Sequence, residues 1–189
     1  MRLPFRRRSM GLLPQPYDYR DYQLAQYHPS LLASLVGMTA GPASDLDSSF
    51  LPNEDQDGVG QCVGQACKAA HEAVQRAQGM AVTVGSSLAT YYNARVESGF
   101  SPTGDMGAYI RAGASSLAGY GLISRADHPD TNPQSRYATR PSQQAYERAL
   151  TRQVLRYVAV PNDLSPVKNL LASGRPIGFG MPLYSSWPQ

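Results

Sequence analysis

Hydrophobic positions in the middle of the chain repeat at the spacing of buried helices. Small and apolar side chains recur every three or four residues from Cys62 until Gly79, which predicts a central helix that packs closely against its neighbours. The same spacing predicts a second helix over residues 87–97 and a third over about residues 106–120. A further short helix is expected over residues 142–152. The middle of the chain is therefore predicted to be helical.

The last part of the chain follows a different pattern. Residues 154–160 alternate between β-branched and other side chains, which predicts a strand, and residues 176–183 predict another. Between them, Ser165 and Pro166 suit the N-cap and first position of a short helix that Gly174 ends. Because helices come first and strands with one helix follow, the pattern indicates the α+β class.

The first fifty residues show no sustained periodicity. They predict an extended segment laid over the folded body, with a short helical piece around residues 31–36. We therefore divide the chain into an extended N-terminal segment (1–50), a helical lobe (51–152) and a partial β lobe (153–189). Within the helical lobe, residues 124–140 are polar and interrupted by prolines, which is typical of a long surface loop.

Composition and charge narrow the range of functions. The 189 residues are 42% hydrophobic and 16% charged, with a formal net charge of +3. Much of the positive excess lies in Arg2 and residues 6–8, which we interpret as a solvated tail, or alternatively as a docking arm for an acidic partner. The nearly neutral remainder argues against a nucleic-acid-binding face. No apolar run approaches the roughly 18 residues of a membrane span, and no export signal is evident. We expect a soluble protein, cytoplasmic or virion-associated.

The two cysteines, Cys62 and Cys67, are five residues apart. On one helix this spacing turns them roughly 140° from each other, so a mutual disulfide is not expected. The spacing of cysteine and histidine residues does not match that of a zinc site. The sequence therefore implies no metal and no organic cofactor.

The stretch that carries chemistry is the loop leading into the helix at Cys62. A thiolate at a helix N-terminus is stabilised by unpaired N–H groups and the helix dipole, so we expect a lowered pKa for Cys62. Its backbone N–H points where an oxyanion could lie, and the amide of Gln56 can supply a second donor. Gly60 would let a substrate backbone approach closely. This arrangement suits nucleophilic attack on a carbonyl.

The loop resembles the nucleophile motif of papain-like cysteine peptidases. Gln56 lies six residues before Cys62, and Gly60 lies two residues before Cys62, as in that family's pattern. The resemblance implies that Cys62 is the nucleophile, that Gln56 is the oxyanion donor, and that the fold has a helical left lobe with a central nucleophile helix and a β-containing right lobe, here incomplete. Further segments similar to bacterial and phage members are residues 12–14, 18–22, 88–95, 105–113, 120–121, 141–146 and 174–180.

By the same resemblance, part of the cleft wall would bind substrate. The implied substrate-binding residues are Gly60, Asp105, Met106 and Gly107. The motif also departs from the family pattern, since Asp57 replaces a glycine and Gln61 replaces a serine. We expect the carboxylate of Asp57 to raise the pKa of the thiol or to alter the loop geometry.

The family's general base and its orienting residue have no evident counterpart. A histidine and an asparagine would follow the strand expected after Pro176, but the last histidine of the sequence is His128. His28 lies in the N-terminal segment, and His71 lies about 13 Å from Cys62 along the helix axis. We expect His128 to face solvent, and none of the three is a predicted base.

Two classes of function remain open. The first is a cysteine peptidase that hydrolyses peptide bonds, or a truncated or degenerate fragment of one, completed by another chain or by a larger assembly. The second is a non-catalytic structural or interaction protein built on a papain-like scaffold, such as a phage virion or tail component. The missing base favours the second class, and the spacing of Gln56 and Cys62 favours the first.

Overall fold

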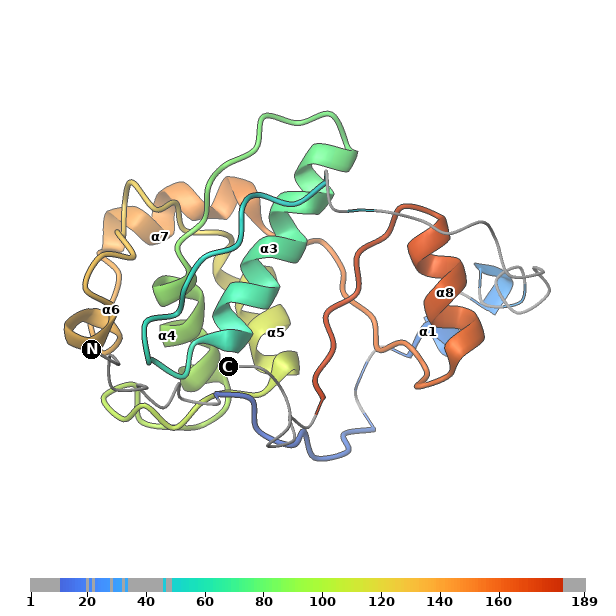
Figure 1. The fold of residues 1–189 in the computed structure, drawn as a ribbon, viewed down its shortest axis with the longest axis horizontal. Coiled ribbons are helices and arrows are strands. Elements are labelled where there is room, and N and C mark those ends of the chain that lie inside the picture. Colours follow the sequence, from blue (N-terminus) through green and yellow to red (C-terminus); the bar gives the residue numbers. More distant parts are fainter. Residues whose placement is uncertain are drawn as a thin grey trace, which may run out of the picture.

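The computed structural model describes residues 11–19, 21, 23–27, 29–31, 33, 46 and 49–181. Its regular elements are helices, arranged as shown in Figure 1. They are α1 (Leu24–Tyr27), α3 (Cys62–Ala77), α4 (Ser87–Glu97), α5 (Ile110–Tyr120), α6 (Pro133–Arg136), α7 (Gln143–Ala149), the 3-10 turn η2 (Leu150–Arg152) and α8 (Leu164–Ala172). No helix in the described part combines the length and apolarity that crossing a membrane requires.

The core is formed by α3, α4 and α5, which pack against one another (Figure 1). Val63 of α3 and Tyr91 and Ala94 of α4 are buried together there. The helices approach closely at Gly64, where an added Cβ would lie 2.4 Å from the carbonyl oxygen of Ser87. The prediction of a central helix that begins at Cys62 is therefore confirmed.

Helix α4 has the bounds that the sequence predicted, and a local cap explains its start. The Ser86 hydroxyl accepts the N–H of Ala89 at 3.0 Å, as an N-cap side chain does. The Asp130 carboxylate then accepts the Ser86 hydroxyl at 2.7 Å and the N–H of Leu88 at 3.0 Å. A long surface loop is thereby tied to the helix N-terminus, where negative charge is favourable.

Two predicted helix starts are wrong. Helix α5 begins at Ile110 rather than near Met106, because the backbone before it pairs with the N-terminal segment. Ala108 donates its N–H to the carbonyl oxygen of Gly11 at 2.9 Å and accepts the N–H of Leu13 at 3.2 Å. Helix α8 begins one residue before Ser165, since Asp163 caps it by accepting the Ser165 N–H at 3.1 Å.

The strands expected over residues 154–160 and 176–183 do not form in the described residues. The described part contains isolated bridges, among them a parallel bridge between Gln23 and Ala159, and no longer ladder. The β-branched side chains of Val158 and Val160 instead pack against a small cluster centred on Leu24 and Leu170, which explains the alternating pattern. Residues 182 and 183 lie outside the described residues.

The N-terminal segment lies over the body, as predicted, where it is described. Arg111 of α5 secures it, donating its backbone N–H to the Gln15 side chain at 2.8 Å and its guanidinium to the carbonyl oxygen of Pro16 at 2.9 Å. The same guanidinium pairs with Asp21. Of the helical piece expected over residues 31–36, residues 31 and 33 are helical and the others lie outside the described residues. The arginines of residues 2–8 also lie outside them.

Helices α1 and α8 lie together at one end of the molecule, away from the core helices (Figure 1). Leu24 of α1 and Leu170 of α8 are both buried and share one apolar cluster. The backbone N–H of Leu24 donates to the carbonyl oxygen of Ala159 at 3.0 Å. The N-terminal segment therefore spans from the core helices to the region around α8.

Candidate active site

Cys62 is the first residue of α3, and the loop before it makes a tight turn. Asp57 and Gly58 both adopt the left-handed region, with φ of 48° and 77°, which reverses the chain before the helix. Gln61 stands at the N-cap, and its side-chain amide donates to the carbonyl oxygen of Gln56 at 3.3 Å. Cys62 and Gln56 line the same open cavity of about 390 Å³. The structure thus places the predicted nucleophile and the predicted oxyanion donor at one cavity, and their catalytic roles stay predictions.

The predicted substrate-binding glycines contact the chain's own N-terminal segment. A Cβ on Gly11 would lie 1.6 Å from the carbonyl oxygen of Gly60, and a Cβ on Gly107 would lie 2.3 Å from that of Gly11. Three backbones can meet this closely because all three residues are glycines. The close backbone approach expected at Gly60 is therefore present, but it is made by Gly11. Met106, beside them, is 66% exposed.

Asp105 faces the nucleophile loop. Both of its carboxylate oxygens accept the backbone N–H of Gly60, each at 3.0 Å. The hydroxyl of Tyr91 donates to the same carboxylate at 2.5 Å and accepts the N–H of Gly107 at 3.0 Å. Gly60, Asp105 and Gly107 are thus brought together, and their binding of substrate stays a prediction.

A buried arginine contacts both Tyr91 and the loop that contains Asp105. Arg95 is fully buried, and its guanidinium lies over the Tyr91 ring at 4.2 Å from the ring centroid. It donates to the carbonyl oxygens of Pro102 at 2.6 Å and Gly104 at 2.7 Å. Arg95 was not among the residues predicted to form the site. Its spacing could have revealed it, because Arg95 lies four residues after Tyr91 on the buried face of α4.

The pKa of Cys62 is raised, contrary to the expectation from its position. Burial is the largest cause, and the charge of Asp105 acts in the same direction. Hydrogen bonds from the backbone of Gly11, Val63 and Cys62 itself lower the pKa but do not compensate. Asp57, the carboxylate suspected from sequence, lies exposed on the turn. The helix N-terminus therefore contributes, but burial decides the direction.

Cys67 is a partly buried thiol that packs against the core cluster around Val63. Burial raises its pKa to about 12, and it packs against Gly113 of α5. Both cysteines are free thiols. Cys62 is therefore the more reactive candidate of the two.

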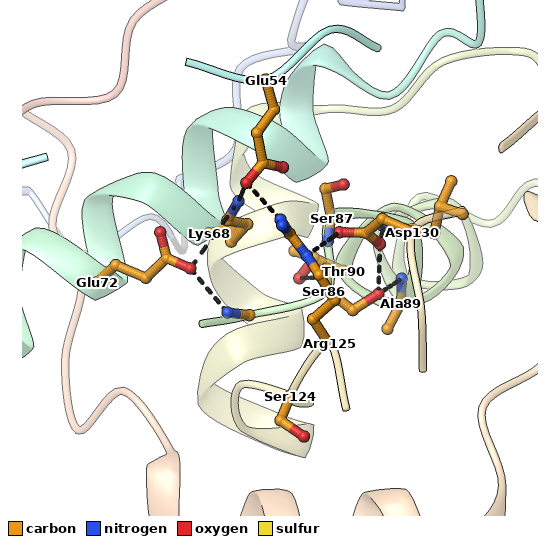
Figure 2. Close-up of polar contacts among 12 residues, drawn as sticks. Glu54, Lys68, Glu72, Ser86, Ser87, Ala89, Thr90, Ser124, Arg125 and Asp130 are labelled. Carbon is orange, nitrogen blue, oxygen red and sulfur yellow. Dashed lines mark hydrogen bonds and ion pairs between the residues drawn. The ribbon is translucent and has the colours of Figure 1, made fainter. Parts of the chain in front are cut away.

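An ion-pair network anchors the loop that carries Gln56 (Figure 2). Glu54 pairs with Lys68 of α3 at 2.7 Å and with Arg125 of the long loop. Burial alone would raise the pKa of Glu54, but the hydrogen bonds from Arg125 and Lys68 outweigh it and leave the pKa lowered. Lys68 also lies 3.9 Å from Glu72, whose carboxylate accepts the N–H of Gly85 at 2.7 Å. Periodicity along the chain does not predict this network, since its members come from four separate segments.

The two described histidines, His71 and His128, are both at least partly shielded from solvent, and burial lowers the pKa of each. His71 lies with Nε2 3.0 Å from the carbonyl oxygen of Arg152, and burial lowers its pKa. His128 was expected to face solvent, and this is wrong: it is only 3% exposed, because the long loop folds back onto α4. Burial and the nearby charge of Arg136 lower its pKa. His28 lies outside the described residues.

The described residues contain no group of three or more histidine, cysteine, aspartate or glutamate side chains that could hold a metal ion. The chemistry that the site offers is that of a partly buried thiol at a helix N-terminus, with a side-chain amide at the same cavity. This is the donor set of acyl transfer through a thioester.

Comparison with known proteins supports this interpretation at the level of the fold. No family model matches the sequence, and no curated protein does. Among solved structures, the chain is similar to xylellain, a cysteine protease from Xylella fastidiosa, with a TM-score of 0.71 and 28% sequence identity. The match covers 92% of this chain and 67% of that one. The chain therefore has the fold of a papain-like cysteine peptidase.

Proposed function

We propose that this chain is the nucleophile-bearing part of a papain-like cysteine peptidase, in which the thiolate of Cys62 attacks the carbonyl carbon of a peptide bond. The observation that carries the proposal is the position of Cys62 at the N-terminus of α3, with Gln56 at the same cavity, in a fold similar to that of a cysteine protease. Peptide or protein is the substrate class that follows.

Besides the thiol, the reaction needs hydrogen-bond donors for the oxyanion and a base that moves the proton. Attack by the Cys62 thiolate would form a tetrahedral oxyanion, which the Cys62 N–H and the Gln56 amide are suited to hold. Collapse would break the C–N bond, release the amine after it gains a proton, and leave a thioester that water hydrolyses. The proton must move through a base, and the contacts of His71 and His128 lie elsewhere.

We therefore propose that the base and its orienting residue are supplied by a segment outside these 189 residues, or by another chain. The match that covers 67% of the similar protease supports a part of a larger catalytic unit. Such a segment would bring an imidazole to the open cavity beside Cys62. An imidazolium there would also offset the burial that raises the pKa of Cys62. Membership of the bacterial or phage type is part of the same proposal.

A second candidate is a non-catalytic structural or interaction role, such as that of a virion component. It is favoured by the contact of Gly11 with Gly60 and by the raised pKa of Cys62. A scaffold of this kind would need neither an accessible cavity nor a thiolate.

The epoxide E-64, which alkylates the nucleophile of such peptidases, separates the two candidates. We expect the chain, together with the segment or second chain that supplies the base, to form a stoichiometric adduct at Cys62, located by peptide mass spectrometry. A Gln56→Ala variant should react more slowly, and a Cys62→Ser variant should not react. Reaction no faster than that of a short cysteine peptide would count against the peptidase and for the structural role.

A further inference from the structure

Two loops meet at the carboxylate of Asp105. One is the nucleophile loop, which Asp105 contacts through the N–H of Gly60 at 3.0 Å to each oxygen. The other is the loop that contains Asp105 itself. There, the Tyr91 hydroxyl donates to the Asp105 carboxylate at 2.5 Å and accepts the N–H of Gly107 at 3.0 Å. Tyr91 is fully buried. The carboxylate is therefore directed at backbone and at a buried hydroxyl.

We infer that Asp105 is a positioning residue, which fixes the loop that carries Cys62 by accepting the N–H of Gly60. The substrate-binding role that the resemblance implies for Asp105 stays a separate prediction. The catalytic meaning of the inference rests on the proposed function. The contact and the charge effect can be measured without turnover.

The positioning part follows from where the contact lies. Gly60 precedes Cys62 by two residues, so the hydrogen bond from Gly60 sets the path by which the backbone enters α3. A hydrogen bond to a carboxylate is about twice as strong as a neutral one. Tyr91 prevents the carboxylate from rotating away. A nucleophile held by such a supporting contact keeps its direction.

A charge effect on the thiol accompanies this contact. A negative charge near a thiol disfavours the thiolate, and Asp105 acts on Cys62 in this direction. The N–H groups of Gly11 and Val63 act against it. The Asp105 carboxylate therefore holds the nucleophile loop in place and also disfavours the thiolate of Cys62.

The test is the rate of iodoacetamide alkylation of Cys62 as a function of pH, measured in a Cys67→Ser background so that one thiol reports. Asp105→Asn keeps an oxygen for the Gly60 N–H but removes the charge. We expect its alkylation midpoint to move to lower pH and its rate at pH 7 to rise about threefold, since the thiolate fraction grows tenfold for each unit by which the pKa falls.

Two further variants separate charge from packing. Tyr91→Phe keeps the charge of Asp105 but removes the hydroxyl, so its midpoint should not fall, while amide hydrogen exchange at Gly60 and Gly107 should accelerate. Asp57→Asn removes an exposed carboxylate at a left-handed position that asparagine tolerates. Its midpoint should move less than that of Asp105→Asn.

An unchanged midpoint in Asp105→Asn, or an equal shift in Asp57→Asn, would overturn the charge effect. If Asp105→Asn does not fold, Tyr91→Phe still decides the positioning role, because unchanged exchange at both amides contradicts it. These readouts do not depend on E-64. A chain that fails the E-64 test but shows the shift keeps this inference and loses the proposed function.

Discussion

The backbone of Gly11 lies against the backbone of Gly60, so closely that a Cβ on Gly11 would come within 1.6 Å of the Gly60 carbonyl oxygen. Gly11 also hydrogen-bonds Cys62 through its backbone and accepts the N–H of Ala108 at 2.9 Å. One residue of the N-terminal segment therefore contacts the nucleophile loop, Cys62 and the backbone of Ala108 together.

Substitution Gly11→Ala is expected to displace this segment and to speed alkylation of Cys62 severalfold. Two effects on the pKa of Cys62 compete in this variant. Loss of the Gly11 hydrogen bond should raise the pKa, and reduced burial of the thiol should lower it. Burial is the larger cause, so the thiolate should become easier to form. Rates with iodoacetamide at pH 7.5 measure the outcome.

The matched control is Gly119→Ala, where an added Cβ meets open space. This variant should react like the unmodified chain. Equal rates in the two variants would show that Gly11 does not cover the thiol.

The two thiols are expected to differ strongly in reactivity. Loss of solvation raises the pKa of Cys67 to about 12, whereas Cys62 lines an open cavity. At pH 8, iodoacetamide should therefore label Cys62 first, as followed by mass spectrometry of the digested protein. Cys62→Ser should lose nearly all early labelling, and Cys67→Ser almost none. Labelling of both cysteines at one rate would contradict the raised pKa of Cys67.

Replacing Lys68 by methionine should destabilise the fold. Lys68 is 3% exposed, and its removal takes the positive charge from between Glu54 and the buried Glu72. Breaking a buried pair by deleting one partner costs about 3 kcal/mol or more. We expect a lower free energy of unfolding in urea, with the loop before Gln56 losing protection from hydrogen exchange.

An exposed pair gives the comparison for this change. Arg148 is 55% exposed and pairs with Asp127 at 2.6 Å, so Arg148→Met should cost less than about 1 kcal/mol. If the two variants lose the same stability, the network of Figure 2 does not anchor the fold.

Stability should fall in mild acid, in part because His128 is buried. Its pKa in the folded chain is lowered, so below the ordinary pKa of about 6.5 the unfolded chain binds the proton more readily than the folded chain. The stabilisation is present above pH 6.5 and is lost as the pH falls toward the folded pKa. His128→Gln should therefore show a weaker decline in unfolding free energy between pH 7 and pH 5. An identical decline would place His128 in solvent.

The predictable parts of the fold are those that local chemistry decides. Helix α4 matched its predicted bounds because its apolar spacing and the Ser86 cap are both encoded within a few residues. Helix α5 began later than predicted because residues before Ile110 pair with Gly11 and Leu13, far away in the sequence. The strand expected over residues 154–160 failed for a similar reason, since its apolar side chains pack on α1 and α8.

The candidate site divides in the same way. The place of Cys62 at a helix start could be predicted from the glycines before it and the helical spacing after it. The direction of its pKa could not, because burial and the charge of Asp105 arise from tertiary contacts. The burial of His128 was likewise hidden, since the loop that carries it folds back onto α4 through Asp130.

The contact between α1 and α8 has a consequence for how the chain reaches this structure. Leu24 is synthesised well before its partners Ala159 and Leu170, which lie far later in the sequence. The core helices α3, α4 and α5 have more local contacts and can assemble before that. The segment that lies against Cys62 is then secured at both ends only after α8 has formed. Until that point, Cys62 is more exposed in the nascent chain than in the folded structure.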